Sequence, residues 1–207
     1  MPVEKIVRDT NRSWGLWLIQ ESEEVLQEQL GDLFQVPDSF TNGNKRLEWL
    51  AGRLLIRNLL QSMNLQFNGI VKDEFGKPFL KNIPHHISLS HSYPYVAAIV
   101  DQDKIVGIDL EQPKEKLLRI APRILASDEL QDAGEDLTKH CVYWCAKEAL
   151  IKVYGKKDLT LAENLIISPF QLKKEGNITG RIIVKDTETT IPLQYKIFED
   201  FVVVFNL

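Results

Sequence analysis

The sequence predicts a mixed α+β protein that is built from two lobes. Each half of the chain contains one long stretch with apolar residues at helical spacing and several short β-rich runs. No Gly/Ser-rich or Pro-rich linker and no low-complexity tract divides the 207 residues. At roughly 100–200 residues per domain, this length suits one large domain or two small ones. We therefore expect an N-terminal α+β lobe over residues 1–103 and a C-terminal α+β lobe over residues 104–207.

The first half is expected to contain two helices and several short strands. Residues Lys45–Met63 form the longer helix because leucines recur there at helical spacing. The acidic stretch Glu21–Leu30 forms a shorter helix, with Gly31 just past its end. A hairpin is expected where Tyr95–Val100 and Ile105–Leu110 flank a polar run. The other strands are expected at Trp14–Ile19, Phe67–Val71 and Ile87–Leu89.

The second half is expected to contain a short helix, a long helix and a β-rich end. Ser127 is a candidate cap for the short helix, because two acidic residues follow it. The long helix spans about Asp136–Tyr154, and Gly155 stands where a C-terminal glycine cap belongs. The strands are expected at 182–184, 191–198 and 201–205.

The composition is that of an ordinary globular protein, with 44% hydrophobic and 26% charged residues. The net charge of −4 disfavours a uniformly basic nucleic-acid binder. Two cysteines, Cys141 and Cys145, fit a reducing compartment with free thiols. No targeting signal is visible, and the apolar runs are too short to span a bilayer. We therefore expect a cytoplasmic protein without a membrane or nucleic-acid partner.

An acidic strand end at Gly107–Glu111 (GIDLE) is the first candidate for chemistry. Successive side chains of a strand alternate between its faces, so Asp109 and Glu111 point one way while Ile108 and Leu110 point the other. Two carboxylates on one face repel each other unless they share a cation, and Mg²⁺ prefers one or two carboxylates plus substrate phosphates. The alternative interpretation is a solvated strand end.

The segment Trp144–Lys152 (WCAKEALIK) is the second candidate. On a helix, Trp144, Lys147, Glu148 and Lys152 occupy one arc about 140° wide. Two ammonium groups then flank a carboxylate that can bind a metal ion or accept a proton, which suits a phosphate site. The alternative is an ordinary amphipathic helix with a surface pair between Glu148 and Lys152, worth roughly 0.2–0.5 kcal/mol.

Two further groups of polar residues lie in the first half. Ser88–Ser92 (SLSHS) follows the turn Gly76–Pro78 (GKP), which places Lys77 between a permissive and a stiff residue. Arg46 and Arg53 are seven residues apart, on nearly the same helix face, where arginine forks suit a phosphate. The alternatives are a hairpin with a polar turn and a solvated helix face.

In their order along the chain, these motifs resemble the 4′-phosphopantetheinyl transferase superfamily, specifically its surfactin-synthetase-activating type. The signature of that type is G-[ILV]-D-[ILV]-E followed by W-x-x-K-E-[AS]-x-x-K, and GIDLE and WCAKEALIK match it without a mismatch. The stretch Ala51–Arg57 (AGRLLIR) also resembles the family's first-lobe helix, and the resemblance runs from about Lys45 to Lys157.

The resemblance implies a pseudo-dimer of two similar α+β lobes in one chain, with the active site in the cleft between them. It implies transfer of the 4′-phosphopantetheine arm of coenzyme A to a serine of an acyl or peptidyl carrier protein, with release of adenosine 3′,5′-bisphosphate. A monomer is expected because one chain carries both halves of the cleft.

The resemblance also implies residue roles. Asp109, Glu111 and Glu148 correspond to ligands of Mg²⁺, and Glu148 also to the proposed base that takes the serine proton. Lys152 would stabilise charge on the pyrophosphate, and Lys147 would hold a nearby phosphate. The residues that would grip the adenosine 3′-phosphate end of coenzyme A are Lys77, Ser90 and His91, with Arg46 and Arg53 as further candidates.

Three more expectations concern partners and alternatives. If residues 116–123 are helical, Lys116, Arg119 and Arg123 lie within about 60° of one another and form a basic face for an acidic carrier protein. One alternative function is a catalytically silent module that binds coenzyme A or a carrier protein. The other is a metal-dependent phosphohydrolase that uses the same carboxylates.

Overall fold

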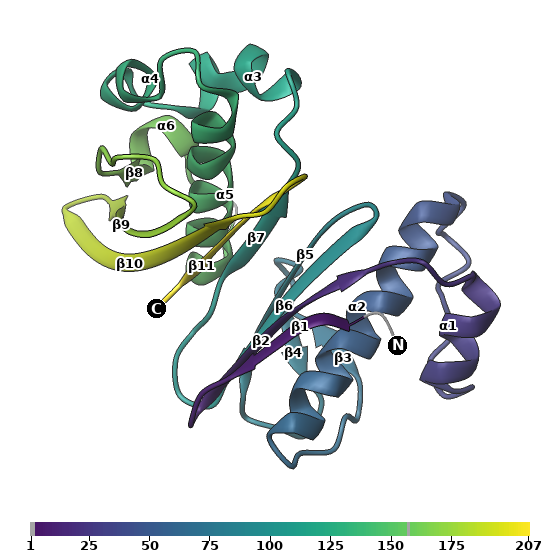
Figure 1. Ribbon diagram of the computed structural model, residues 1–207. Helices are drawn as coiled ribbons and strands as arrows, with labels where there is room; N and C mark the ends of the chain where they lie inside the picture. Colours follow the sequence, from purple (N-terminus) through teal and green to yellow (C-terminus); the bar gives the residue numbers. More distant parts are fainter. Residues whose placement is uncertain (1–2, 157) are drawn as a thin grey trace. The chain divides into compact units, whose positions relative to one another are not determined.

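The computed structural model describes residues 3–156 and 158–207, and it confirms the mixed α+β class. Lys157, where the sequence resemblance ends, lies outside the described residues. The chain divides into two compact units, Met1–Val106 and Gly107–Leu207. Each unit holds one antiparallel sheet and one long helix that packs against it (Figure 1).

The first unit carries a six-stranded sheet in the order β1-β2-β6-β5-β4-β3. The long helix α2 packs against β2 and β6, and it buries a continuous row of leucines there. The elements of this unit are β1 (Val3–Arg8), β2 (Arg12–Leu18), α1 (Glu23–Leu30), α2 (Gly43–Ser62), β3 (Ile70–Lys72), β4 (Pro78–Leu80), β5 (His86–Ser92) and β6 (Tyr95–Asp101).

Both helices of the first unit begin at side-chain caps. Ser22 accepts the backbone N–H of Val25 at the start of α1, and Asn42 accepts that of Lys45 at the start of α2. Each cap satisfies one of the backbone donors that a helix start leaves unpaired. Gly31 follows α1 with φ of 88°, as the sequence predicted for a helix end.

The hairpin expected between Tyr95–Val100 and Ile105–Leu110 is wrong. Strand β6 pairs with β2 and β5 in the first unit, whereas β7 (Ile108–Glu111) pairs with β11 (Val202–Asn206) in the second. The polar run between them, which contains Asp101, joins the two units instead of turning a hairpin. Asp101 accepts the backbone N–H groups of Asp103 and Lys104, and this closes a local turn.

The second unit carries a five-stranded sheet in the order β7-β11-β10-β9-β8, and its long helix is α5 (Leu137–Tyr154). Asp136 caps the start of α5, and Gly155 ends it with φ of 83°, which confirms the predicted glycine cap. The remaining elements are β7, α3 (Lys116–Ile124), α4 (Ser127–Ala133), α6 (Leu161–Asn164), β8 (Leu165–Ile167), β9 (Glu175–Val184), β10 (Thr187–Ile197) and β11.

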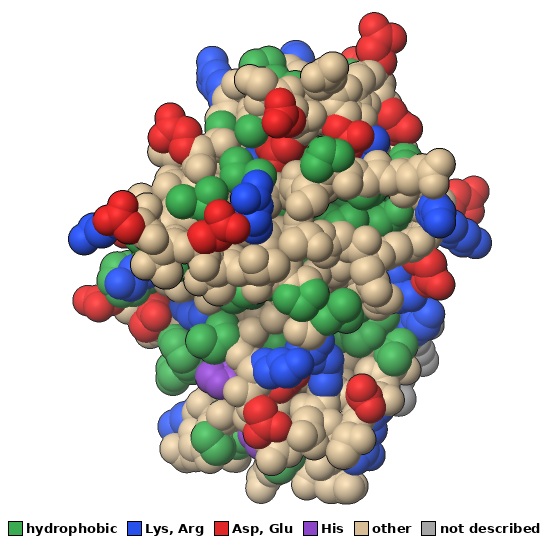
Figure 2. Space-filling view, turned by 90° about the vertical axis from the view of Figure 1, so that its left-hand side faces the viewer, with side chains coloured by type: hydrophobic (Ala, Val, Ile, Leu, Met, Phe, Trp, Pro, Cys, Tyr) green, Lys and Arg blue, Asp and Glu red, His purple; other side chains and the backbone are tan. Residues whose placement is uncertain are grey.

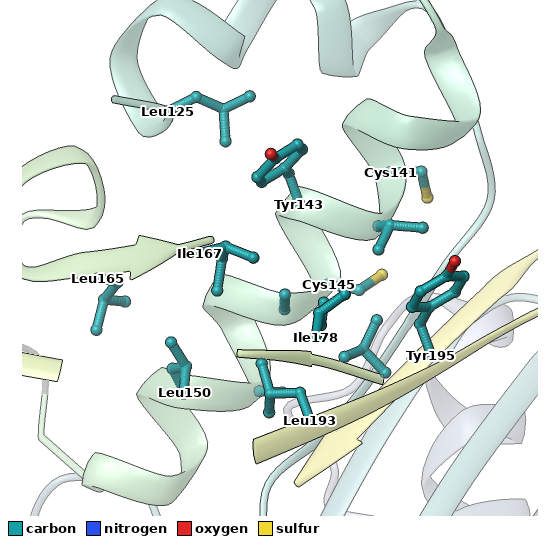
Figure 3. Close-up of a cluster of buried hydrophobic side chains, with 14 of the residues drawn as sticks. Leu125, Cys141, Tyr143, Cys145, Leu150, Leu165, Ile167, Ile178, Leu193 and Tyr195 are labelled. Atoms are coloured by element: carbon teal, nitrogen blue, oxygen red, sulfur yellow. The ribbon is translucent and has the colours of Figure 1, made fainter. Parts of the chain in front are cut away.

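The core of the second unit lies between α5 and the sheet. Figure 3 shows Cys145 and Leu150 of the helix on the side of Leu193 and Tyr195 of β10, whereas Tyr143 lies near Leu125. Cys141 and Cys145 are buried free thiols, and burial raises the pKa of Cys145 well above its ordinary value. Buried thiols in apolar surroundings are unreactive, so the two cysteines act as small apolar residues of the core.

The surface mixes charges of both signs. Figure 2 shows acidic and basic side chains interspersed over the visible face, with smaller hydrophobic areas between them. Within the described part of the chain, no helix has the length and hydropathy that crossing a membrane requires.

Candidate active site

The strand β7 and the helix α5 bring the two signature motifs together. In β7, Asp109 pairs with Val204 and Glu111 pairs with Val202 of β11. Both valines belong to the core that packs against α5, and cross-strand partners share a face. Asp109 and Glu111 therefore share one face of the sheet, as the alternation in the sequence predicted. That face is the one that carries α5, whereas the alternation suggested that only Ile108 and Leu110 point into a core.

Gly107 allows β7 to approach α5 this closely. A Cβ atom at this position would stand 2.1 Å from the backbone carbonyl oxygen of Ala149 and 3.0 Å from the backbone nitrogen of Val153. Because both neighbours are backbone atoms, they cannot rotate away. The Gly107 N–H also donates to Asn206 Oδ1 at 2.8 Å, which fixes the start of the strand. The glycine thus sets the distance between the two motifs.

Asp109 and Lys152 form the central ion pair. Lys152 Nζ lies 2.8 Å from Asp109 Oδ1 and donates also to the carbonyl oxygen of Ile108 at 2.7 Å. The Asp109 side chain is almost buried, whereas the Lys152 side chain keeps about a quarter of its surface exposed. The pair therefore places one cation at the edge of a low-dielectric site, where charge–charge attraction is stronger than in water.

Glu148 is the most strongly perturbed acid of the site. Burial and the negative charge of Asp109 raise its pKa to about 7, and Lys152 opposes both. Two carboxylates that influence each other in this way compete for one proton or share a cation. A pKa near 7 is also the value at which a carboxylate serves as a general base under neutral conditions.

Glu111 has different partners from the other two carboxylates. Its Oε2 accepts from Lys116 Nζ at 2.9 Å, and its Oε1 accepts the backbone N–H of Gln112 at 3.0 Å. Among the described residues, no three His, Cys, Asp or Glu side chains form a cluster ready to hold a metal ion. Asp109 influences Glu148 electrostatically, whereas Glu111 forms an ion pair with Lys116.

Lys147 occupies a different place from the one expected for a phosphate-binding residue. Its side chain has no exposed surface, and its Nζ lies 2.6 Å from Glu129 Oε2. The ammonium also donates to the carbonyl oxygens of Leu161 and Leu165, so its three donors are all used. The Glu129 carboxylate in turn accepts the N–H of Ile167. Lys147 thus joins α4, α6 and β8 inside the core.

The sequence did not indicate Glu129 as a partner, because it lies 18 residues from Lys147 and reads as part of the acidic first turn of α4. Burial lowers the pKa of Lys147, and Glu129 opposes that shift. A buried ion pair of this kind is costly to break, because the remaining charge loses its partner.

Arg46 and Arg53 do not form a clamp. The Arg46 guanidinium pairs with Glu23 of α1 and donates to the carbonyl oxygen of Phe40 at 3.2 Å. Arg53 lies over the Trp49 ring, 3.5 Å from its centroid, and burial lowers its pKa to about 10. Each arginine therefore stabilises α2 through a separate contact.

Lys77, Ser90 and His91 lie in the first unit, as the chain order requires. Lys77 follows a tight turn in which Gly76 adopts φ of 87° and Asp73 accepts the Lys77 N–H at 2.8 Å. Burial lowers the Lys77 pKa. Ser90 is buried and His91 is exposed, because neighbouring residues of β5 point to opposite faces. A residue that the sequence analysis missed, Glu48, contacts His91.

Comparisons with known proteins agree with the motifs. The sequence profile of the 4′-phosphopantetheinyl transferase superfamily matches residues 105–205. The 4′-phosphopantetheinyl transferase psf-1 of Bacillus pumilus is 35% identical over 142 residues, which cover 64% of this chain and 59% of that protein. The 4′-phosphopantetheinyl transferase Sfp of Bacillus subtilis strain 168 is 32% identical over 119 residues, 52% of this chain and 51% of that protein.

A third relative is matched over more of its length. The 4′-phosphopantetheinyl transferase AcpT of Salmonella typhimurium is 29% identical over 157 residues, which cover 67% of this chain and 80% of that protein. The chain thus spans about three fifths of the Bacillus pumilus protein and about half of Sfp. The matched region contains β7 and α5, which carry the signature motifs. Residues 105–205 are therefore similar to the 4′-phosphopantetheinyl transferase superfamily, and the relatives of the chain include Sfp.

Proposed function

We propose that this protein transfers the 4′-phosphopantetheine arm of coenzyme A to a serine of an acyl or peptidyl carrier protein. The observation that carries the proposal is the meeting of Asp109, Glu148 and Lys152 between β7 and α5, inside the region that matches the family. The reaction is attack of a serine hydroxyl on the β-phosphorus of the pyrophosphate, and adenosine 3′,5′-bisphosphate leaves. It needs neutralised phosphate charge, positioning and a base.

The proposal includes Mg²⁺, because the chemistry of the donor set suits that ion. Asp109 and Glu148 are two neighbouring carboxylates that disfavour each other's charge, and Mg²⁺ binds one or two protein carboxylates together with substrate phosphates. Glu111 is the third candidate ligand, and it would bind the ion after its ion pair with Lys116 breaks. When bound, the ion would neutralise charge on the pyrophosphate oxygens.

The protein's own groups divide the remaining tasks. Glu148 accepts the proton of the serine hydroxyl, directly or through a water molecule, and its pKa of about 7 suits that role. Lys152 places an ammonium beside Asp109 and stabilises the negative charge of the pyrophosphate. Lys77 of the first unit offers a cationic donor for the adenosine 3′-phosphate end of coenzyme A, and His91 offers a ring N–H donor.

The basic face of α3 is the proposed docking surface for the carrier. Lys116, Arg119 and Arg123 are exposed on this helix, and Leu118 is exposed among them. Opposite charges steer the encounter of two proteins, so an acidic carrier suits this face. Lys116 is paired with Glu111, so a change at Lys116 would also alter a candidate metal ligand. Docking is therefore tested at Arg119 and Arg123.

The proposal places the protein in the reducing cytoplasm, since both thiols are free and buried. Two other functions compete with the transferase. A silent module would bind coenzyme A or a carrier without turnover, but it would have no use for a buried base whose pKa is near 7. A phosphohydrolase would release nucleotide without any carrier present.

Intact-mass spectrometry of apo carrier proteins tests the proposal. Each carrier is incubated with the protein, coenzyme A and Mg²⁺, and the expected result is a gain of one phosphopantetheine arm. Asp109→Ala should abolish the gain, whereas Asp128→Ala, which removes an exposed carboxylate from α4, should leave it unchanged. Nucleotide release without a carrier would favour hydrolysis. Coenzyme A binding without modification of any carrier would favour the silent module.

A further inference from the structure

Glu48 is a buried acidic residue near the start of α2. It is 8% exposed, and its neighbours Leu50 and Ala51 have no exposed surface. Burying a carboxylate costs free energy unless hydrogen bonds and opposite charge compensate it. The contacts of Glu48 therefore have to explain its presence.

Both oxygens of Glu48 face the end of strand β5. Oε2 lies 2.9 Å from His91 Nδ1, and Oε1 accepts the backbone N–H of Tyr93 at 3.0 Å. The two contacts fix the ring of His91 and the turn that follows it at the same time. The His91 side chain is nevertheless 55% exposed, so the buried carboxylate supports an imidazole that faces solvent.

This geometry determines which ring nitrogen carries the first proton. A contact of 2.9 Å between Nδ1 and a carboxylate oxygen requires hydrogen on Nδ1. Glu48 contacts only Nδ1, so the second nitrogen, Nε2, is the ring atom left for an anionic ligand. Carboxylates hold metal-binding histidines in orientation in the same way.

We propose that Glu48 is a positioning residue for phosphate binding, because it holds His91 with Nε2 directed at the 3′-phosphate of coenzyme A. This inference rests on the proposed function, which supplies the ligand. Charge-assisted hydrogen bonds to phosphate are roughly twice as strong as neutral ones, and they depend on a fixed direction. Glu48 supplies the counter-charge and the direction from inside the fold, and it does not touch the ligand.

The test compares the affinities of coenzyme A and 3′-dephospho-coenzyme A. The ratio is the dissociation constant of 3′-dephospho-coenzyme A divided by that of coenzyme A, and it measures how much the 3′-phosphate contributes to the affinity. Glu48→Gln keeps the shape of the side chain and an oxygen for the Tyr93 N–H, but it removes the charge that supports the imidazolium. We expect the ratio to fall about five- to tenfold, since a charged hydrogen bond becomes a neutral one. Both constants are measured by calorimetry on the full chain.

A double-mutant cycle separates positioning from a purely structural role. His91→Ala should lower the ratio at least as far as Glu48→Gln, and adding Glu48→Gln to His91→Ala should lower it no further. Asp101→Asn is the matched control, because it removes a buried carboxylate of the same unit that pairs with Arg12 at the other end of β6. That control should leave the ratio unchanged even where it lowers stability.

Several results would overturn the inference. One is an unchanged ratio in Glu48→Gln, and another is an equal loss of affinity for both ligands. If Glu48→Gln does not fold, ¹⁵N spectra of the wild-type His91 ring replace it. Protonated Nδ1 in the free protein, and a protonated Nε2 signal on addition of adenosine 3′,5′-bisphosphate, would support the proposal. A proton only on Nε2 in the free protein would overturn it.

The proposed function and this inference can fail separately. If the wild-type protein binds no coenzyme A and modifies no carrier, both are wrong. If it binds coenzyme A, discriminates against the dephospho form through His91, and shows no dependence on Glu48, only the positioning role is wrong.

Discussion

Replacing Glu148 by Gln should make the protein more stable at pH 8 while removing its activity. Burial and the charge of Asp109 raise the Glu148 pKa from 4.5 to about 7. Between these values the folded protein holds a proton that the unfolded chain has lost, so stability falls as the pH rises from 4.5 to 7. At about 1.4 kcal/mol for each pH unit, the carboxylate costs about 3 kcal/mol above pH 7.

The assay is thermal unfolding at pH 8 and at pH 4.5, both in EDTA. At about 2–4 °C for each kcal/mol in a chain of this size, Glu148→Gln should melt about 6–12 °C higher than wild type at pH 8. At pH 4.5 the two should melt together, because the wild-type carboxyl is then protonated in the folded state. Turnover should fall by roughly 10²–10⁴-fold.

The control is Glu188→Gln, which removes an exposed carboxylate from the second unit and should change stability by no more than about 0.5 kcal/mol. Equal melting of Glu148→Gln and wild type at pH 8 would refute the reasoning, because the buried charge would then carry no cost. Near-normal turnover would refute the assignment of Glu148 as base.

Three further predictions concern the strand–helix contact, the buried pair and the carrier. Gly107→Ala should cost at least about 2 kcal/mol in a denaturation curve and abolish carrier modification, because the added Cβ meets the backbone of α5. Lys147→Met should cost about 3–5 kcal/mol, and Glu129→Gln in the same chain should recover part of that loss. Arg119→Glu with Arg123→Glu should raise the KM for the carrier at least several-fold and leave the KM for coenzyme A unchanged.

Each of these has an outcome that would contradict it. Gly43→Ala is the control for the glycine, because nothing lies within 4 Å of a Cβ there, and an equal loss in both variants would remove the steric explanation. A Lys147→Met variant as stable as wild type would show that the pair is dispensable. An unchanged KM for the carrier would exclude α3 as the docking surface.

The sequence predicted the positions of the helix and strand that carry the site better than it predicted the pairing of strands into sheets. Side-chain alternation in GIDLE and the glycine cap of α5 are local properties, so Asp109 and Glu111 share a face and Gly155 ends α5, as predicted. Strand pairing is not local. Alternation tells which residues share a face but not which strand lies beside it, and β6 and β7 accordingly entered different sheets.

Side-chain partners that are distant in sequence were also beyond prediction. Glu23 is 23 residues from Arg46, and its ion pair with that arginine competes with the phosphate clamp that the spacing allowed. Glu48 read as an ordinary polar residue on a helix, and only the fold of β5 brings His91 to it. The sequence gives little signal for this contact, because Glu48 follows Lys45 and Arg46 near the start of the helix.

The two lysines of WCAKEALIK show why a motif on one helix can serve two purposes. Five residues correspond to a rotation of about 140° around a helix, so Lys147 and Lys152 point in different directions. Lys147 turns into the core toward Glu129, and Lys152 turns toward Asp109. Loss of Lys147 should therefore reduce activity only as far as it reduces the folded fraction. Lys152→Met should leave a folded protein with a lower kcat, since Lys152 keeps about a quarter of its side chain in solvent. Measuring both stability and kcat for the two variants distinguishes support of the fold from stabilisation of the reaction.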